Sequence, residues 1–166
     1  MLVETLAFVV GRDSAHIDAA AQVWSEAVAA RDSYAEVPAA DVTRPLIERI
    51  VASSPRSVLL IASDAAGDVV AFAAAKPVDG AAEHAHVRYI GVRPGRWGAG
   101  AGRQLVAELA ARLRSAGYAA ARLEVYVDNP RAVRLYERLG WVPYGDPTPH
   151  PSSGRLEQEY RLALQR

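Results

Sequence analysis

Three glycines that alternate with alanine interrupt the chain between an apolar run and a helical pattern, and this combination limits the folds available to it. Residues 92–105 read Val-Arg-Pro-Gly-Arg-Trp-Gly-Ala-Gly-Ala-Gly-Arg-Gln-Leu. Residues 87–92 before the loop are mostly apolar, as in a buried strand. After it, apolar residues recur at helical spacing, at Leu105, Val106, Leu109 and Leu113. A glycine loop is therefore predicted to lead from a strand into the N-terminus of a helix.

A loop of this kind suits a bound anion. The N–H groups of a first helical turn have no partner within the helix, and the helix dipole favours negative charge there. Glycine also lacks the Cβ atom that would hold phosphate oxygens away from the backbone. Two familiar phosphate loops do not fit the spacing. A P-loop needs Gly-Lys-Ser/Thr where this chain has Gly102 and Arg103, and the dinucleotide pattern needs a third glycine at Arg103 or Leu105. A glycine-rich turn without a ligand remains the alternative.

A third phosphate loop does match. Residues 92–105 resemble the pyrophosphate loop of the GNAT superfamily, the acyl-CoA-dependent N-acyltransferases, whose pattern is roughly V-x-P-x-x-(R/Q)-G-x-G-(I/A)-G-x-x-L. One position departs from the pattern, because Trp97 stands where Arg or Gln is usual. The resemblance implies that one side-chain contact to the pyrophosphate is missing and that the backbone cradle is intact.

A second segment, residues 123–141, carries an independent resemblance. Its apolar residues first alternate as in a strand; Asn129 then suits a helix N-cap, Pro130 the first helical position, and Gly140 the helix end. The segment resembles the second GNAT signature, L-x-V-x-x-x-N-x-x-A-x-x-L-Y-x-x-x-G-(F/W). Every fixed position of that signature matches: Leu123, Val125, Asn129, Ala132, Leu135, Tyr136, Gly140 and Trp141.

The resemblance implies a mixed α/β fold, in which helices flank a central mixed, mostly antiparallel sheet and two strands splay apart to admit coenzyme A. We expect residues 1–166 to form a single domain. Helices are expected at 14–30 and 43–53, capped by Ser14 and Thr43, then from the glycine loop to 117 and from 130 to 140. Strands are expected at 2–10, 58–63, 69–76, 83–92, 123–127, 141–144 and 156–164, with residues 146–154 as a loop.

The resemblance also implies roles for individual residues. The strand before the loop would bind the acyl carbonyl and the pantetheine arm, and Asn129 would also bind the pantetheine arm. The loop would hold the pyrophosphate. The cofactor-binding residues expected besides Asn129 are Ile90, Gly91, Val92, Trp97, Gly98, Ala99, Gly100, Ala101, Gly102 and Arg103.

Two side chains are expected to move protons. Tyr136 would protonate the leaving thiolate, since a phenol with a pKa of about 10 carries its proton at neutral pH; the alternative is a core aromatic. His86 stands where family members often carry a glutamate, and an imidazole can accept a proton near neutrality. Glu83, His84 and a chain of waters are alternatives to it, and both histidines could be ordinary strand residues. Glu124 and Tyr126 have no assigned role.

Composition argues against several other classes of protein and of functional site. Lys and Arg total 19, as do Asp and Glu, so net charge indicates neither nucleic acid nor membrane. The absence of cysteine excludes disulfides, thiolate metal sites and a cysteine nucleophile. His84 and His86 lack a clear third ligand, so no metal is expected. There is no apolar run of about 18 residues and no signal-peptide pattern at the start, so we expect a cytoplasmic protein.

These observations favour an N-acetyltransferase that moves an acetyl group from acetyl-CoA directly to a primary amine in a ternary complex. The alternatives are a non-catalytic CoA-binding regulatory domain on the same fold and, more remotely, an interaction domain without CoA. The acceptor could be a small molecule or a peptide, and a homodimer is compatible with the resemblance. The acceptor site could be lined by Trp24, Tyr34 and Trp97. Asp32, Glu36 and Asp41 could attract its cationic amine or could be a solvated loop.

Overall fold

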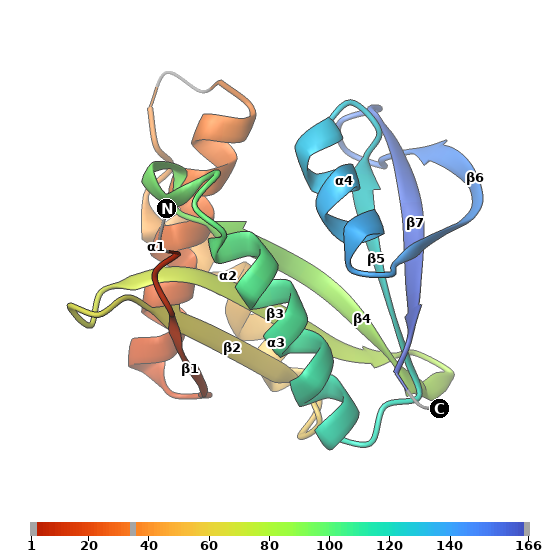
Figure 1. The fold of residues 1–166 in the computed structure, drawn as a ribbon, viewed down its shortest axis with the longest axis horizontal. Helices are drawn as coiled ribbons and strands as arrows, with labels where there is room; N and C mark the ends of the chain where they lie inside the picture. Colours follow the sequence, from red (N-terminus) through yellow and green to blue (C-terminus); the bar gives the residue numbers. More distant parts are fainter. Residues whose placement is uncertain (1–2, 34–35, 165–166) are drawn as a thin grey trace.

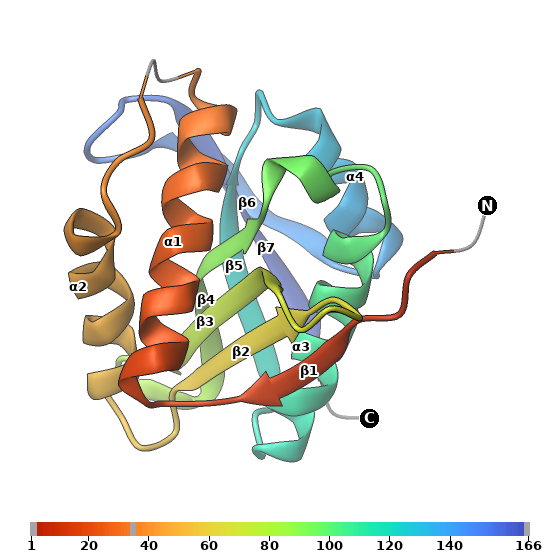
Figure 2. The same ribbon diagram turned by 90° about the vertical axis from the view of Figure 1, so that its left-hand side faces the viewer.

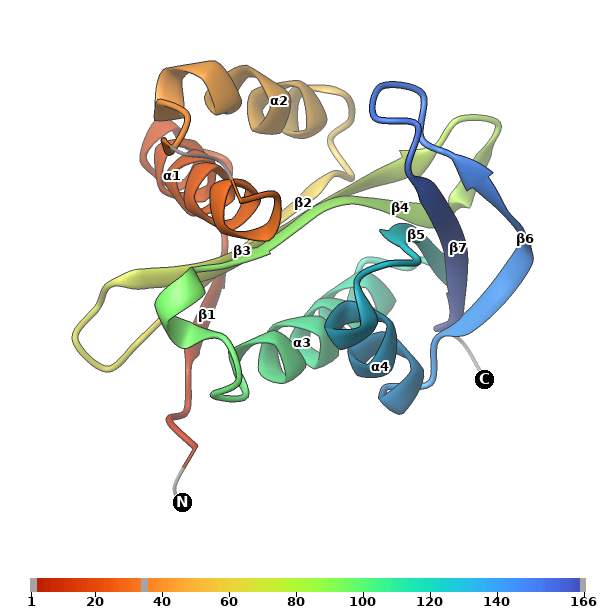
Figure 3. The ribbon, with the colours of Figure 1, turned by 90° about the horizontal axis from the view of Figure 1, so that it is seen from above.

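The computed structural model describes residues 3–33 and 36–164, which form a seven-stranded sheet with helices on both faces (Figure 1). Seen from above, α1 and α2 cover one face and α3 and α4 the other (Figure 3). The elements in chain order are β1 (Ala7–Val10), α1 (Ser14–Arg31), α2 (Ala40–Ala52), β2 (Val58–Ser63), β3 (Val69–Val78), β4 (Ala81–Val92), the 3₁₀ turn η1 (Pro94–Arg96), α3 (Ala101–Ser115), β5 (Ala120–Tyr126), α4 (Pro130–Arg138), β6 (Val142–Pro149) and β7 (Leu156–Ala163).

The sheet is mixed and mostly antiparallel, which confirms the expected fold class. Its strand order is β1-β2-β3-β4-β5-β7-β6, and among these neighbours only β4 and β5 run parallel. The parallel pair is joined through α3, because parallel neighbours need a crossover connection. The crossover places the glycine loop at the carboxyl end of β4.

Two hydrophobic clusters hold the helices on the sheet. One lies beneath α3 and α4 and the other beneath α1 and α2. Leu105, Val106, Leu109 and Leu113 of α3 are fully buried, as their helical spacing predicted. Strand β3 contributes a run of small residues to both clusters, which lets the helices approach the sheet closely: Ala71, Ala73, Ala74 and Ala75.

Several element boundaries differ from the sequence prediction. Helix α1 is capped by Asp13 rather than Ser14, since the Asp13 carboxylate accepts the His16 N–H at 2.9 Å. Helix α2 begins at Ala40, so Thr43 is not its cap but a buried residue inside it. Strand β6 extends to Pro149 through residues predicted as a loop, because a sheet edge tolerates proline.

Within the described residues, the first strand begins at Ala7 and is shorter than expected, while the predicted start at Leu2 lies outside them. Residues 3–6 instead run beside the start of α3, where the Leu6 N–H donates to Gln104 Oε1 at 3.0 Å and Gln104 Nε2 donates to the Glu4 carbonyl at 2.7 Å. Glu4 also forms an ion pair with Arg96 of η1 at 2.7 Å. The segment therefore packs against the glycine loop.

Candidate active site

The two parallel strands separate soon after they pair. Hydrogen-bonded register between β4 and β5 is confined to His84–His86 opposite Ala120–Arg122. Strand β4 nevertheless stays paired with β3 as far as Val92. On its other edge, the second half of β4 therefore has backbone groups that are not paired with β5, and Figure 1 shows the two strands diverging. Ile90, Gly91 and Val92 lie on this open stretch, as the splayed-strand prediction requires.

A β-bulge turns the side chains of β4 at the same point. Ala74 pairs with Tyr89 and Ala75 with Val87, so Arg88 is an extra residue. Val87 and Ile90 both pack in the cluster beneath α3, whereas Tyr89 packs in the cluster beneath α1. The bulge therefore turns Tyr89 toward α1 while Ile90 stays on the α3 side.

The glycine loop reaches α3 through two left-handed glycines. Gly98 has φ +77° and Gly100 has φ +87°, conformations that residues with a side chain rarely adopt. Gly100 is the N-cap of α3 and no side chain caps the helix, so the N–H groups of Ala101, Gly102 and Arg103 lack partners within it. The Ala99 N–H, in contrast, is engaged by the Arg96 carbonyl at 3.3 Å. The helix terminus thus presents free donors beside the split between the strands.

Trp97 connects three parts of this site. Its indole Nε1 donates to the Val92 carbonyl at 2.8 Å, which fixes the ring against the end of β4. The guanidinium carbon of Arg131, from the first turn of α4, lies 5.2 Å from the centre of the ring. The residue that departs from the family pattern is therefore a structural contact between the glycine loop and α4.

Asn129 occupies the N-terminus of α4 as predicted. Its Oδ1 accepts the Ala132 N–H at 3.3 Å, so the side-chain N–H₂ donors take no part in capping the helix. Helix α4 also packs closely on α3, because a Cβ at Gly102 would lie 3.3 Å from Leu135 Cδ2. Asn129 and the first turn of α3 consequently lie on neighbouring elements.

Tyr136 lies on α4 and is buried, with 8% of its surface exposed. Its ring packs beside Trp141, with centroids 6.0 Å apart. Burial raises the pKa of Tyr136 to about 12. The hydroxyl therefore carries its proton throughout the physiological pH range, but the raised pKa also makes it a weaker acid than an ordinary phenol. The core-aromatic interpretation is equally compatible with this packing.

His86 forms a hydrogen bond that the sequence analysis did not anticipate. Its Nε2 lies 2.7 Å from Glu124 Oε2, across the point where β4 and β5 part. Burial by itself raises the pKa of Glu124, but the hydrogen bond to His86 and the nearby charges of His86, Arg122 and Arg88 lower it below its ordinary value. The side chain of His86 is 11% exposed and that of Glu124 29%. The pair combines an imidazole with an orienting carboxylate.

The sequence indicated which face of its strand Glu124 occupies, but not that Glu124 contacts His86. Alternation placed Glu124 on the opposite face from Leu123, and hence on the polar face of its strand. What was lacking was the register that sets Arg122 beside His86 and brings Glu124 within reach of it. His84 lies earlier on the same strand, and Glu83 is exposed. Neither forms the contact that His86 makes.

The residues expected to line an acceptor site are not all available to it. Trp24 packs edge-on against Tyr89 and Phe72, at 5.1 and 6.2 Å between centroids, within the cluster beneath α1. Asp32 accepts from Arg31 at 2.9 Å and from Arg155 at 3.1 Å. Glu36 and Asp41 are exposed, and Tyr34 lies outside the described residues.

Arg155 ties the turn between β6 and β7 to the end of α1. Besides Asp32, it contacts Asp128 at 2.7 Å and lies 3.8 Å from the centre of the Tyr126 ring. The hydrogen bond from Arg31, together with that from Arg155, lowers the pKa of Asp32 against the effect of burial. Asp32 is therefore a partner of two arginines rather than a free anion for a cationic substrate.

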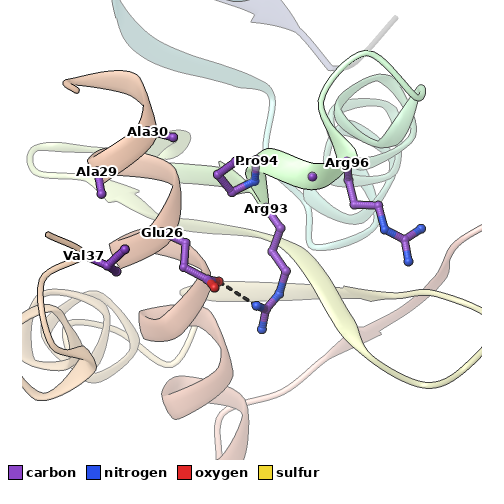
Figure 4. Close-up of a pocket in the computed structure, with 8 residues that line it drawn as sticks. Glu26, Ala29, Ala30, Val37, Arg93, Pro94 and Arg96 are labelled. Carbon is purple, nitrogen blue, oxygen red and sulfur yellow. Dashed lines mark hydrogen bonds and ion pairs between the residues drawn. The ribbon is translucent and has the colours of Figure 1, made fainter. Parts of the chain in front are cut away.

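A shallow cavity of about 550 Å³ opens beside the glycine loop on the α1 side (Figure 4). It is lined by the C-terminal half of α1, by Val37 and by η1, which lies alongside that part of α1 (Figure 2). Arg93 and Glu26 form an ion pair across it at 2.6 Å. None of the predicted catalytic or cofactor-binding residues lines this cavity.

Comparison with known proteins identifies the family of this chain. Residues 23–141 match the model of the Acetyltransferase (GNAT) family. The match covers well over half of the sequence and spans the glycine loop, β5 and α4. The chain belongs to the GNAT family of acetyltransferases.

Individual relatives agree with this assignment. A segment of 58 residues, 35% of this chain, is 45% identical to mycothiol acetyltransferase from Streptomyces scabiei, of which it spans 19%. A GCN5-related N-acetyltransferase from Kribbella flavida superposes with a TM-score of 0.75 at 26% identity, over 95% of this chain and 97% of that one. The Salmonella typhimurium protein yncA, solved with its cofactor acetyl-CoA, has the same fold, with a TM-score of 0.74 at 21% identity, over 98% and 95% of the two chains.

Over residues 3–33 and 36–164, no helix has both the length and the apolarity needed to cross a bilayer. Within the same residues, no three histidine or acidic side chains gather closely enough to hold a metal ion.

Proposed function

We propose that this chain, acting as a single catalytic domain, transfers an acetyl group from acetyl-CoA to a primary amine in a ternary complex. The observation that carries the proposal is the His86–Glu124 pair, which lies where β4 and β5 separate. The same opening is bordered by the uncapped N-terminus of α3 and by Asn129. These groups would supply donors for an anion and a base for an amine at one split in the sheet.

The binding groups fit a CoA thioester. The N–H groups of Ala101, Gly102 and Arg103 would hold the pyrophosphate at the positive end of the α3 dipole. The open edge of β4 offers its backbone to the pantetheine amides, and the side-chain amide of Asn129 can bind the same arm. An N–H group on β4 between Ile90 and Val92 would polarise the thioester carbonyl.

The reaction then needs two proton transfers. The amine nitrogen attacks the thioester carbonyl carbon and loses a proton to His86, which Glu124 orients. The carbon–sulfur bond breaks, and the thiolate takes a proton from the hydroxyl of Tyr136. The proton on His86 returns through solvent to the tyrosinate, so the net products are the amide and free CoA. Direct transfer of this kind needs no covalent intermediate on the protein.

The acceptor is proposed only as a small-molecule or peptide amine. Asp32 is engaged by arginines, so it does not supply the cation-binding site expected from the sequence. Tyr89 and Glu124 remain on the face of the sheet from which an amine could reach His86.

The proposal is tested by free-thiol release from acetyl-CoA across a panel of amino acids, polyamines, aminoglycosides and peptide N-termini. Initial rates are measured with both substrates varied. Intersecting double-reciprocal lines are expected for a ternary complex, whereas parallel lines would indicate a covalent acyl-enzyme and overturn the mechanism. CoA binding without thiol release for any amine would instead indicate a regulatory CoA-binding domain, and no CoA binding at all would indicate an interaction domain.

A further inference from the structure

We propose that Arg131, at the N-terminus of α4, supplies the positive charge that the glycine loop lacks at Trp97 and binds the pyrophosphate of the cofactor from the α4 side. This inference rests on the proposed function, because it assigns one more residue to the same CoA site. It concerns a departure of this chain from its family pattern, namely a tryptophan in place of a cation or an amide donor.

The first observation is the contact between the two side chains. The Arg131 guanidinium carbon lies 5.2 Å from the centre of the Trp97 ring. The ring is held in place because its Nε1 donates to the Val92 carbonyl at 2.8 Å. A guanidinium over a fixed aromatic face is attracted to it and keeps its edge N–H groups free for a phosphate. Trp97 thus holds a cation next to the loop instead of contributing one.

The second observation is the side of α4 on which Arg131 lies. Leu135 follows four residues later, so the two side chains share one face of the helix. Leu135 is the residue that would contact a Cβ at Gly102, in the first turn of α3, at 3.3 Å. Arg131 therefore lies on the side of α4 that faces the free N–H groups of α3.

The third observation is how the neighbouring arginines are engaged. Arg93 is paired with Glu26 at 2.6 Å, and Arg96 is paired with both Glu4 and Asp64. Within the described part of the chain, Arg131 and Arg103 form no ion pair. Arg103 follows the loop directly on α3, so Arg131 adds a cation from the opposite side.

The contact between Arg131 and Trp97 changes the effect expected of a substitution at Trp97. From the sequence alone, Trp97→Arg is expected to leave CoA affinity equal or improved. In the structure, that substitution removes the indole that positions Arg131, which would weaken CoA binding. It also adds a cation directly, which would strengthen CoA binding, so the two effects oppose each other. The informative comparison is therefore a cycle in which Trp97 and Arg131 are changed separately and together.

The experiment is calorimetric titration with CoA and with dephospho-CoA, which lacks the 3′-phosphate but retains the pyrophosphate. The variants are Arg131→Gln, Trp97→Arg and the double variant, with Arg138→Gln as the control that removes an equal charge from the last turn of α4. Thermal melting of each variant checks that it folds. Titrations at two salt concentrations check that the effect is electrostatic.

Arg131→Gln is expected to weaken both ligands about tenfold, equivalent to about 1.4 kcal/mol. Arg138→Gln is expected to change affinity less than twofold, and the double variant to bind within about threefold of the unchanged chain because the Trp97→Arg substitution then supplies the charge. Equal affinity of Arg131→Gln and the unchanged chain would overturn the inference. So would a loss seen for CoA but not for dephospho-CoA, since it would assign Arg131 to the 3′-phosphate. If the unchanged chain bound neither ligand, the proposed function itself would fail.

Discussion

Ala99 is the position at which the pyrophosphate site can be tested with the least disturbance to the fold. It lies between two left-handed glycines, is exposed, and does not itself have a positive φ. Its N–H donates to the Arg96 carbonyl, and a new side chain leaves that bond in place. Gly100 is a poorer choice, because a Cβ there would lie 2.9 Å from Val3 Cγ1 and would be strained at φ +87°.

We therefore compare Ala99→Asp with Ala99→Asn, which have the same shape and differ by one charge. Two unit charges 4 Å apart repel by about 1 kcal/mol in water and by about 4 kcal/mol at the effective dielectric of a protein surface. Because the loop is exposed, the lower part of this range applies. A repulsion of about 1–2 kcal/mol corresponds to an affinity loss of roughly five- to thirtyfold.

The assay is calorimetric titration of CoA into each variant at low and high salt. Ala99→Asp is expected to bind more weakly than Ala99→Asn by the factor given above, and salt is expected to narrow the gap. Equal affinities for the two variants at low salt would refute the placement of the pyrophosphate at this loop, whatever the affinity of the unchanged chain.

Three other sets of variants test the proton transfers and a buried hydrogen bond. Tyr136→Phe is expected to lower kcat about 10²–10⁴-fold with CoA affinity nearly unchanged, and a full rate would show that another group protonates the thiolate. Glu124→Gln keeps the shape of the carboxylate and is expected to lower kcat about tenfold or more. His86→Ala is expected to raise the apparent pH optimum, since an amine that is already deprotonated at high pH needs no base. If the acidic limb of the pH–rate profile were unmoved in both variants, the pair would have no part in the mechanism. Thr43→Val leaves the buried Ser25 hydroxyl, 2.8 Å from Thr43 Oγ1, without that partner; it is expected to cost about 1–3 kcal/mol in urea unfolding, and adding Ser25→Ala should cost less than the sum of the single changes.

The lowered pKa of Glu124 adds a pH dependence to stability. A carboxyl whose pKa is lower in the folded chain stabilises the fold when ionised, so this contribution is present at neutral pH and is lost as the pH falls through the lowered pKa. Glu124→Gln is therefore expected to flatten the acid side of a plot of unfolding free energy against pH. A slope identical to that of the unchanged chain would show that the Glu124 carboxyl does not contribute to the pH dependence of stability.

The structural features that the sequence predicted correctly are those that depend on residues close together along the chain. Glycine spacing, the Asn-Pro pair and the helical spacing after the loop defined a strand, a loop and two helix termini, and the structure contains all of them. These features depend on neighbours only a few positions away. The same reasoning was weaker at helix starts, where Asp13 displaced Ser14 as the cap by accepting the His16 N–H.

The residues that sequence missed are those whose role depends on register across the sheet. Glu124 reaches His86 only because β4 and β5 align His86 with Arg122, a pairing between segments that are 36 positions apart. Arg131 meets Trp97 only because α4 packs on the start of α3. Neither contact has a signature along the chain. The pairing of Asp32 with Arg155 was missed for the same reason, since Arg155 lies on the distant turn before β7.

Acetyl transfer is tested most directly by supplying acetyl-CoA with an isotopically labelled acetyl group and following the label by mass spectrometry across the amine panel. The proposed function predicts that the label appears as an N-acetyl group on at least one amine, with release of one equivalent of CoA, and that Tyr136→Phe slows this transfer while still binding CoA. Bound acetyl-CoA with no labelled product from any amine, in the unchanged chain, would contradict it.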